Sequence, residues 1–126
     1  MRTTILLAAA LTAALALSAT ALASRAPTRT ERVAIVAAWS GSPTTLADTQ
    51  CRVIRVSTAR AGWAALRARF TKPCRGQAFD GSTFLRKRDG KWGVVIGGSS
   101  VDAKDCRLIP LAVRRDLPAF TSSLGC

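Results

Sequence analysis

The four cysteines constrain the fold of this chain more than any other feature of its sequence. They stand at positions 51, 74, 106 and 126 of 126 residues. A domain of about 100 residues buries only about 60–65% of its unfolded surface, so cross-links would add noticeably to its stability. In an oxidising compartment, four cysteines favour two disulfides over reactive thiols, and three connectivities are open. A metal site or a redox pair is the alternative, but neither has a Cys-x-x-Cys spacing to support it.

The first 23 residues have the three parts of a cleavable secretion signal. Arg2 supplies a positive charge, residues 5–17 form an apolar Ala/Leu-rich run, and Ala21-Leu22-Ala23 suits signal peptidase. A transmembrane anchor is the alternative, because the apolar stretch is close to the ~20 residues that a membrane span needs. However, this stretch is rich in alanine, and a cleavage site closes it. A lipoprotein anchor has no attachment cysteine at the cleavage point, and no second long apolar run follows. The sequence therefore predicts a signal peptide over residues 1–23 and one small secreted, extracellular domain over 24–126, with no stable membrane anchor after cleavage.

The chain is strongly basic and lacks several residue types that carry chemistry. It has 19 Lys and Arg against 7 Asp and Glu, for a net charge of +12. Such a surplus attracts anionic partners: nucleic acid, anionic lipid, cell-wall polymers or acidic proteins. Solvated charge with no specific ligand is the alternative, because the basic residues are scattered. The absence of His removes Ser-His and Cys-His catalytic pairs and imidazole metal ligands. We expect a non-enzymatic protein with no cofactor and no metal.

An amphipathic helix is predicted after a short polar segment at residues 24–30. Thr28 and Glu31 have the spacing of a capping box, in which each side chain binds a free amide at the helix start. Apolar residues then recur on one helical face: Val33, Val36 and Ala37, with Ile35 and Trp39 beside them. Gly41 and Pro43 end the helix after about three turns. We expect this helix to pack on the core.

Four segments favour strands, at residues 51–57, 63–70, 83–88 and 91–96. The second also fits a helical stripe, but a short turn through Gly62 favours a strand. Between the last two, Asp89-Gly90 predicts a type I′ turn. Alternation then predicts one face with Trp92, Val94 and Ile96, and the other with Val95. The last strand ends at Gly97-Gly98-Ser99-Ser100, which lacks the Gly-Lys-Ser/Thr ending of a phosphate loop.

The remaining segments predict one short helix and a disulfide pattern. Pro110 opens a helix over residues 111–116, and Leu117-Pro118 ends it. If Cys51 opens one strand and Cys74 follows its antiparallel partner, these two cysteines meet and Cys106 is left to Cys126. The predicted fold is α+β: an N-terminal helix packed on an antiparallel sheet of about four strands, with a short disulfide-stapled C-terminal helix.

Basic residues on and beside the predicted strands suggest a surface for an anionic ligand. They are Arg52, Arg55, Arg67, Arg69, Arg86, Lys87 and Arg88. Together with Trp63 and Trp92 they resemble a sheet face that stacks bases or sugars and neutralises phosphates. The alternative buries both Trp side chains under the helix and leaves the arginines on the outer face of the sheet.

Carboxylates suggest two further sites, and we expect neither. Asp102 and Asp105, with Asp80 or Asp89, would supply the hard oxygen ligands that calcium takes, but no EF-hand pattern is present. A carboxylate pair for glycoside hydrolysis would come from the set Glu31, Asp48, Asp80, Asp102 and Asp116. Nothing in the sequence sets two of these at a suitable separation.

Several short motifs in residues 51–126 resemble a group of small exported actinobacterial proteins with no assigned function. The motifs are Arg55-Val56-Ser57-Thr58 before Trp63-Ala64; Gly90-Lys91-Trp92-Gly93-Val94-Val95 before Gly98-Ser99; and Cys106, Ile109-Pro110, Arg115-Asp116-Leu117 and Cys126. The resemblance implies secretion and a helix-plus-sheet fold. It brings no catalytic residues to this chain.

The sequence thus predicts a binding or interaction module for an anionic extracellular or cell-envelope partner. That partner would be an anionic polymer or a secreted protein, and nucleic acid stays open. A secreted inhibitor of an enzyme is the alternative function, and a small carboxylate-dependent hydrolase is a third.

Overall fold

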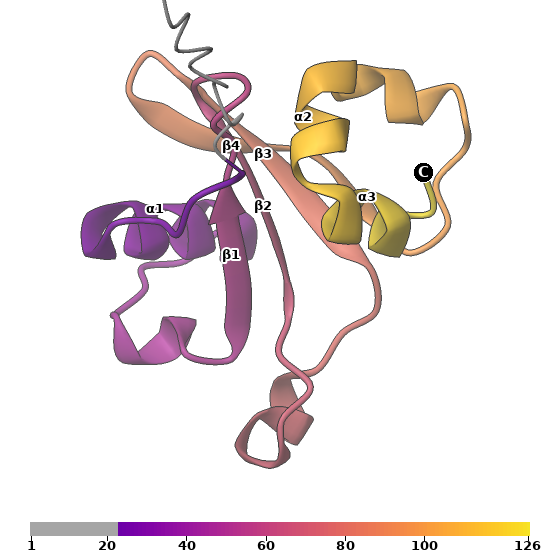
Figure 1. Ribbon diagram of the computed structural model, residues 1–126. Coiled ribbons are helices and arrows are strands. Elements are labelled where there is room, and N and C mark those ends of the chain that lie inside the picture. Colours follow the sequence, from indigo (N-terminus) through magenta and orange to yellow (C-terminus); the bar gives the residue numbers. More distant parts are fainter. Residues whose placement is uncertain (1–22) are drawn as a thin grey trace, which may run out of the picture.

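The computed structural model describes residues 23–126, so the predicted signal peptide lies outside the described residues. Figure 1 shows a sheet with helix α1 on one side and helices α2 and α3 on the other. The helices are α1 (Arg29–Ser40), α2 (Leu111–Asp116) and α3 (Pro118–Leu124), with short 3-10 turns η1 (Ala47–Thr49), η2 (Lys72–Gln77) and η3 (Asp105–Leu108). This arrangement confirms the predicted α+β class.

The sheet is a four-stranded antiparallel meander. Its strands are β1 (Arg52–Val56), β2 (Trp63–Ala68), β3 (Ser82–Arg88) and β4 (Lys91–Gly98), in the order β1-β2-β3-β4. All four predicted strands are present, and Trp63–Ala68 is a strand rather than a helix. Phe70, which the prediction included in that strand, lies beyond its end and is 67% exposed. The outer edge of β1 pairs at one point with the N-terminal segment, through an Arg25–Val56 bridge.

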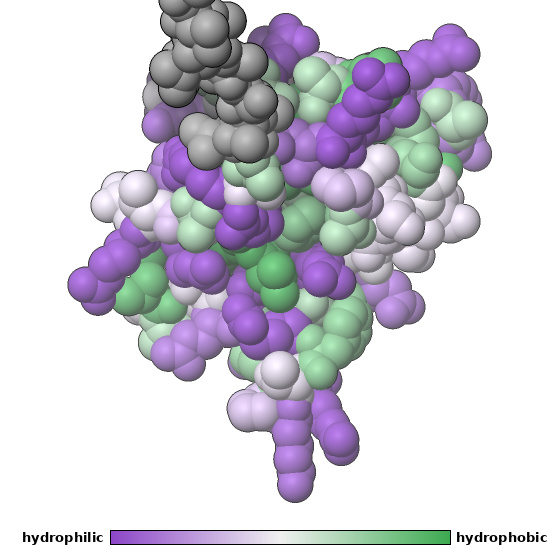
Figure 2. Space-filling view, viewed as in Figure 1, coloured by the Kyte–Doolittle hydropathy of each residue, from purple (hydrophilic) through white to green (hydrophobic). Residues whose placement is uncertain are grey.

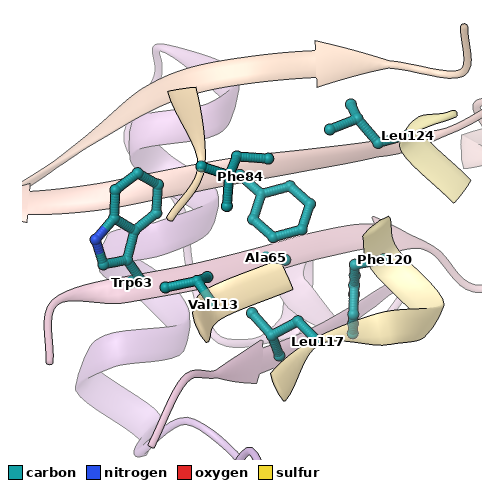
Figure 3. Packing of buried hydrophobic residues seen from close by; sticks show 8 residues of the cluster. Trp63, Ala65, Phe84, Val113, Leu117, Phe120 and Leu124 are labelled. Carbon is teal, nitrogen blue, oxygen red and sulfur yellow. The ribbon is translucent and has the colours of Figure 1, made fainter. Parts of the chain in front are cut away.

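Both faces of the sheet are buried, each against different helices. Residues of α1 pack with one face in a cluster of Ile35, Val36, Ile54, Val56, Ala64, Leu66 and Leu85. The other face packs with the C-terminal helices in a cluster of Trp63, Ala65, Phe84, Ile109, Val113, Leu117, Phe120 and Leu124. Figure 3 shows the second cluster, with Phe84 and Ala65 from the sheet facing Val113, Leu117 and Phe120. Alternation along each strand sends successive side chains to these two cores.

The predicted capping box and stop signal define α1. The Thr28 hydroxyl accepts from the Glu31 amide, the Glu31 carboxylate accepts from the Thr28 amide, and Gly41 closes the helix with a φ of 71°. Of the predicted face, Val36 is buried, together with Ile35, which the prediction placed beside it, whereas Val33 and Ala37 are only partly buried. Val33 lies instead in a shallow groove with Leu46 on the outer side of the helix. Apolar residues occur on more than one side of this helix, and only packing on the sheet decides which side is buried.

The two disulfides join the cysteines in the pattern that the sequence predicted. Cys51 is bonded to Cys74, and Cys106 to Cys126. The first bond links the start of β1 to η2, and the second links η3 to the segment after α3. All four cysteines are bonded, which fits an oxidising compartment.

The β3–β4 hairpin has the predicted turn and one unpredicted irregularity. Asp89 and Gly90 both have positive φ, at 49° and 76°, as a type I′ turn requires. A bulge then shifts the register, so that Leu85 pairs with Val94 but Phe84 pairs with Ile96. The predicted common face of Trp92, Val94 and Ile96 is therefore wrong: Trp92 packs on the α1 side and Ile96 on the opposite side. The extra residue at a bulge reverses the alternation beyond it.

The end of the chain is more helical than predicted. Helix α2 has the predicted bounds, but Leu117-Pro118 does not start an irregular tail. Pro118 is instead the first residue of α3, a position where its missing N–H is not needed. The buried side chains of this helix, Phe120 and Leu124, supply one end of the second core.

Candidate anion-binding site at the β3–β4 hairpin

A groove of about 430 Å³ lies beside the turn that joins β3 to β4. It is lined by Arg86, Arg88, Lys91, Trp92, Gly93, Val94 and Val95. Gly93 makes the hollow, because a Cβ atom built on it would meet nothing within 4 Å. Cationic side chains thus surround a stretch of bare backbone on the edge strand of the sheet.

The strand register brings these cations together. Arg86 pairs with Gly93, and Arg88 pairs with Lys91 two rows nearer the turn. Lys91 is two residues from Gly93 on the same strand, so both lie on one face. Arg86, Arg88 and Lys91 therefore converge on the side of the hairpin where Gly93 leaves space.

Two aromatic rings lie beneath the basic side chains at this end of the sheet. The Arg86 guanidinium lies 5.7 Å from the Trp63 ring centre, and the Lys87 ammonium lies 6.0 Å from that of Trp92. Trp63 is 3% exposed and belongs to the second core. Each ring therefore lies within cation–π range of the charged group of its neighbour.

The cations of the groove have no carboxylate partner within residues 23–126. Ion pairs in this part of the chain join Arg25 to Glu31 at 2.7 Å and Lys104 to Asp102 at 3.9 Å, and neither involves the groove. The Arg25 guanidinium holds the pKa of Glu31 at about 2, and the Thr28 amide and the nearby Lys87 charge lower it further against the effect of burial. Lys87 thus has Glu31 nearby, whereas Arg86, Arg88 and Lys91 form no ion pair within the described residues.

The structure divides the seven predicted basic residues among four places. Arg86, Lys87 and Arg88 lie at the hairpin, where β1 ends and β2 begins, and Arg52 and Arg69 lie at the opposite end of the sheet. Arg55 donates to the hydroxyl and carbonyl of Ser24. Arg67 lies 5.6 Å from the Phe120 ring centre, against α3. Of the seven, only Arg86 and Arg88 line the candidate groove, because Lys87 lies on the opposite face of the hairpin beside Trp92. Figure 2 likewise shows hydrophilic side chains spread over the visible face rather than gathered in one place.

The two Trp residues do not share a sheet face, so neither sequence interpretation of them holds. Trp63 packs on the side of α2 and α3, and Trp92 packs on the side of α1. The one-residue offset between the two pairs Trp63–Arg86 and Lys87–Trp92 puts them on opposite sides. Helices cover both faces, so the sheet has no exposed aromatic face.

Three of the seven carboxylates considered in the sequence accept hydrogen bonds within the fold. The Asp48 carboxylate accepts from the backbone and hydroxyl of Thr45, which lower its pKa. Asp116 accepts from Ser57, Thr58 and Ala59, and Glu31 caps α1. Among residues 23–126, no three carboxylate or cysteine side chains lie close enough together to hold a metal ion.

Gly93 and Lys91 are the residues of this site that sequence reasoning missed. Their signal is present, because a glycine inside an alternating strand often marks a close approach or a binding position. Its cationic neighbours, however, come from β3, and only the register shows that they surround it.

Comparison with known protein families, with curated proteins and with solved structures found no match for this chain. Within the described residues, no helix combines the length and the apolar character needed to cross a membrane.

Proposed function

We propose that this protein is a secreted, non-enzymatic binding module, and that its hairpin groove binds an anionic extracellular or cell-envelope partner. The observation that carries the proposal is the convergence of Arg86, Arg88 and Lys91 around Gly93 without a carboxylate partner. Like charges gathered in this way repel one another, and a bound anion would relieve that repulsion.

The shape of the site favours a chain-like ligand. The groove runs along an edge strand, and its lining combines three cations with the apolar residues Val94 and Val95. Guanidinium groups bind phosphate or carboxylate in two-pronged fashion, whereas Lys91 supplies a compact charge. A polymer with repeated phosphate or carboxylate groups fits this arrangement, and the wild-type excess of positive charge would steer it toward the protein.

Salt-dependent retention on immobilised poly(glycerol phosphate) tests this proposal. The double variant Arg88→Gln/Lys91→Gln should elute at lower salt than the wild type, and the salt dependence of log K should fall by up to about two released counterions. The matched control is Lys72→Gln/Arg75→Gln, which removes the same charge from the exposed residues of η2. Equal losses in both variants would show that net charge alone, and not the groove, governs retention.

A second candidate function, inhibition of a secreted enzyme, is favoured by the outer edge of β4. In the described residues this strand pairs with β3 alone. Pairs in an antiparallel hairpin alternate between hydrogen-bonded and non-hydrogen-bonded, beginning with the hydrogen-bonded pair beside the turn, here Arg88 and Lys91. The backbone N–H and C=O groups of Trp92 and Val94 therefore point away from β3. An added strand would bind there by backbone hydrogen bonds. Tight one-to-one association that is insensitive to salt would support this function over the first.

A further inference from the structure

A second pair of cations lines a separate pocket at the opposite end of the sheet. This pocket has a volume of about 370 Å³ and is lined by Arg32, Leu46, Thr49, Gln50 and Arg69. Arg32 comes from α1, Arg69 follows β2, and the other three belong to the connection through η1. Residues distant in sequence therefore bring two guanidinium groups to one hollow.

Backbone carbonyls hold each of these guanidinium groups in place. Nη1 of Arg32 donates to the carbonyls of Thr49 and Arg52 at 3.4 and 3.2 Å. Nε of Arg69 donates to the carbonyl of Gln50 at 3.1 Å. Each side chain is anchored through one nitrogen, which leaves the N–H groups on the other nitrogens for a ligand.

The backbone around the pocket is itself cross-linked. The amide of Arg69 donates to the carbonyl of Cys51 at 2.9 Å, and Cys51 is bonded to Cys74. Gln50 directly precedes that cysteine. The two arginines are therefore fixed on a rigid corner of the molecule, which lowers the entropy cost of binding.

No carboxylate within residues 23–126 forms an ion pair with either arginine. Asp48, the acidic residue of η1, has its Oδ2 occupied by Thr45. Burial and then the positive charge of Arg69 lower the pKa of Arg32 below its ordinary value. The fold thus keeps a partly buried arginine close to a second one and supplies no compensating charge.

We propose that this Arg32–Arg69 pocket binds a phosphate group between its two guanidinium groups. Two planar forks with several free N–H donors match the acceptor oxygens and double charge of a phosphate monoester. The pocket volume is within the ~300–1,000 Å³ of small-molecule sites, and Leu46 offers an apolar wall to the group that carries the phosphate. The phosphate belongs either to a small molecule or to the end of a polymer. This site is independent of the hairpin groove.

NMR titration with inorganic phosphate at constant ionic strength tests the pocket. The amides of Thr49, Gln50 and Arg69 should shift with a saturating dependence, and chloride at the same ionic strength should not reproduce it. Gln50→Glu places a carboxylate in the pocket without removing an arginine, and it should weaken phosphate binding about tenfold or more. Gln77→Glu makes the same charge change on η2 and should leave binding within about twofold.

A second variant, Arg69→Gln, tests the pocket independently of any folding defect in Gln50→Glu. Arg69→Gln should weaken phosphate binding about tenfold, whereas Arg75→Gln, which removes an exposed charge outside the pocket, should not. Glycerol phosphate and poly(glycerol phosphate) distinguish the two sources of the group, since a polymer-end site binds both and a small-molecule site prefers the monoester. Equal phosphate affinity in the wild type, Gln50→Glu and Arg69→Gln would overturn the proposal. Loss of phosphate binding in Arg88→Gln/Lys91→Gln would place the anion at the hairpin instead.

Discussion

Arg52 was predicted to bind a ligand, but in the folded protein its side chain contacts other parts of the chain. Its side chain is buried, and its guanidinium lies 4.7 Å from the Trp39 ring centre and 5.2 Å from that of Phe79. It also donates to the carbonyls of Cys51 and Gln77. Arg52 therefore packs at the edge of the core on the α1 side, whereas Arg88 is exposed at the hairpin. The two arginines differ in surroundings that composition and spacing do not describe.

Asp116 joins two of the short motifs that stand about 60 residues apart. Its Oδ2 accepts from the Ser57 hydroxyl and from the amides of Thr58 and Ala59, at 2.8, 2.8 and 3.2 Å. Burial raises the pKa of Asp116, but the hydrogen bonds from Ser57, Thr58 and Ala59 outweigh it, so the pKa lies below its usual range. The acidic residue of the C-terminal motif thus orders the β1–β2 turn.

Asp116→Asn should lower the free energy of unfolding by about 1–3 kcal/mol at neutral pH, because hydrogen bonds to a charged acceptor weaken. Since the folded pKa lies below the unfolded one, the charge stabilises the fold above the unfolded pKa. That contribution disappears as the pH falls through the folded pKa. Urea unfolding at neutral and acidic pH measures the difference. The exposed Asp80→Asn is the control, and an equal loss there would contradict the role of Asp116.

At the scale of elements, Gly81, directly before β3, is required by a close approach of two backbones. Gly81 has a φ of 81°, and a Cβ built on it would lie 1.8 Å from the carbonyl oxygen of Gly98. Gly98 belongs to the Gly-Gly-Ser-Ser segment that ends β4. This segment is therefore the packing partner of the β3 start rather than a loop open to a ligand.

Gly81→Ala should destabilise the protein by more than about 3 kcal/mol, because two backbones would have to move apart. Gly41→Ala is a matched control, since Gly41 also has a positive φ, of 71°, but a Cβ there meets nothing within 4 Å. That control should cost only about 1 kcal/mol, from backbone strain alone. Thermal unfolding of both variants separates the two effects, and similar losses would show that contact with Gly98 is unimportant.

The cap of α1 gives the fold a second acid-sensitive point. The Glu31 carboxylate joins the Thr28 amide and the Arg25 guanidinium, and its pKa is lowered from 4.5 to about 2 chiefly by Arg25. Glu31→Gln should reduce stability by roughly 1–2 kcal/mol at neutral pH, after allowance for screening by solvent. Because the folded pKa is depressed, this difference should be constant above about 4.5 and shrink as the pH falls to about 2. Urea titrations across that range check it. A difference that stays the same down to acid pH would contradict the role of the charge.

Elements with local signals could be predicted, and those that depend on distant contacts could not. Asp89-Gly90 and the Thr28–Glu31 box act through their own backbone, and both are confirmed. Helix α3 was missed because Pro118 suits either the end of one helix or the start of another, and burial of Phe120 and Leu124 decides for the second. The bulge after Val94 was missed because it depends on how β4 meets β3.

At the scale of the whole molecule, two cross-links hold the ends of the two-faced core. The Cys51–Cys74 and Cys106–Cys126 bonds span 23 and 20 residues. Removing either pair by double substitution with alanine should lower the free energy of unfolding by about 3 kcal/mol, since the loops are nearly equal in length. Urea unfolding of each variant under oxidising conditions measures the loss. An unchanged midpoint in either variant would show that its cross-link adds nothing to stability.

The sequence alone determined the cysteine framework, the hairpin turn, the start of α1 and the class of the fold. Each of these depends on a few neighbouring residues or on the end-to-end geometry of adjacent strands. The tertiary structure alone decided which arginines remain available. Burial against Trp39 and Phe79 engages Arg52, whereas the register of β3 with β4 gathers Arg86, Arg88 and Lys91 around Gly93. A side chain's availability to a ligand depends on what packs against it, and those contacts come from segments far away in the chain.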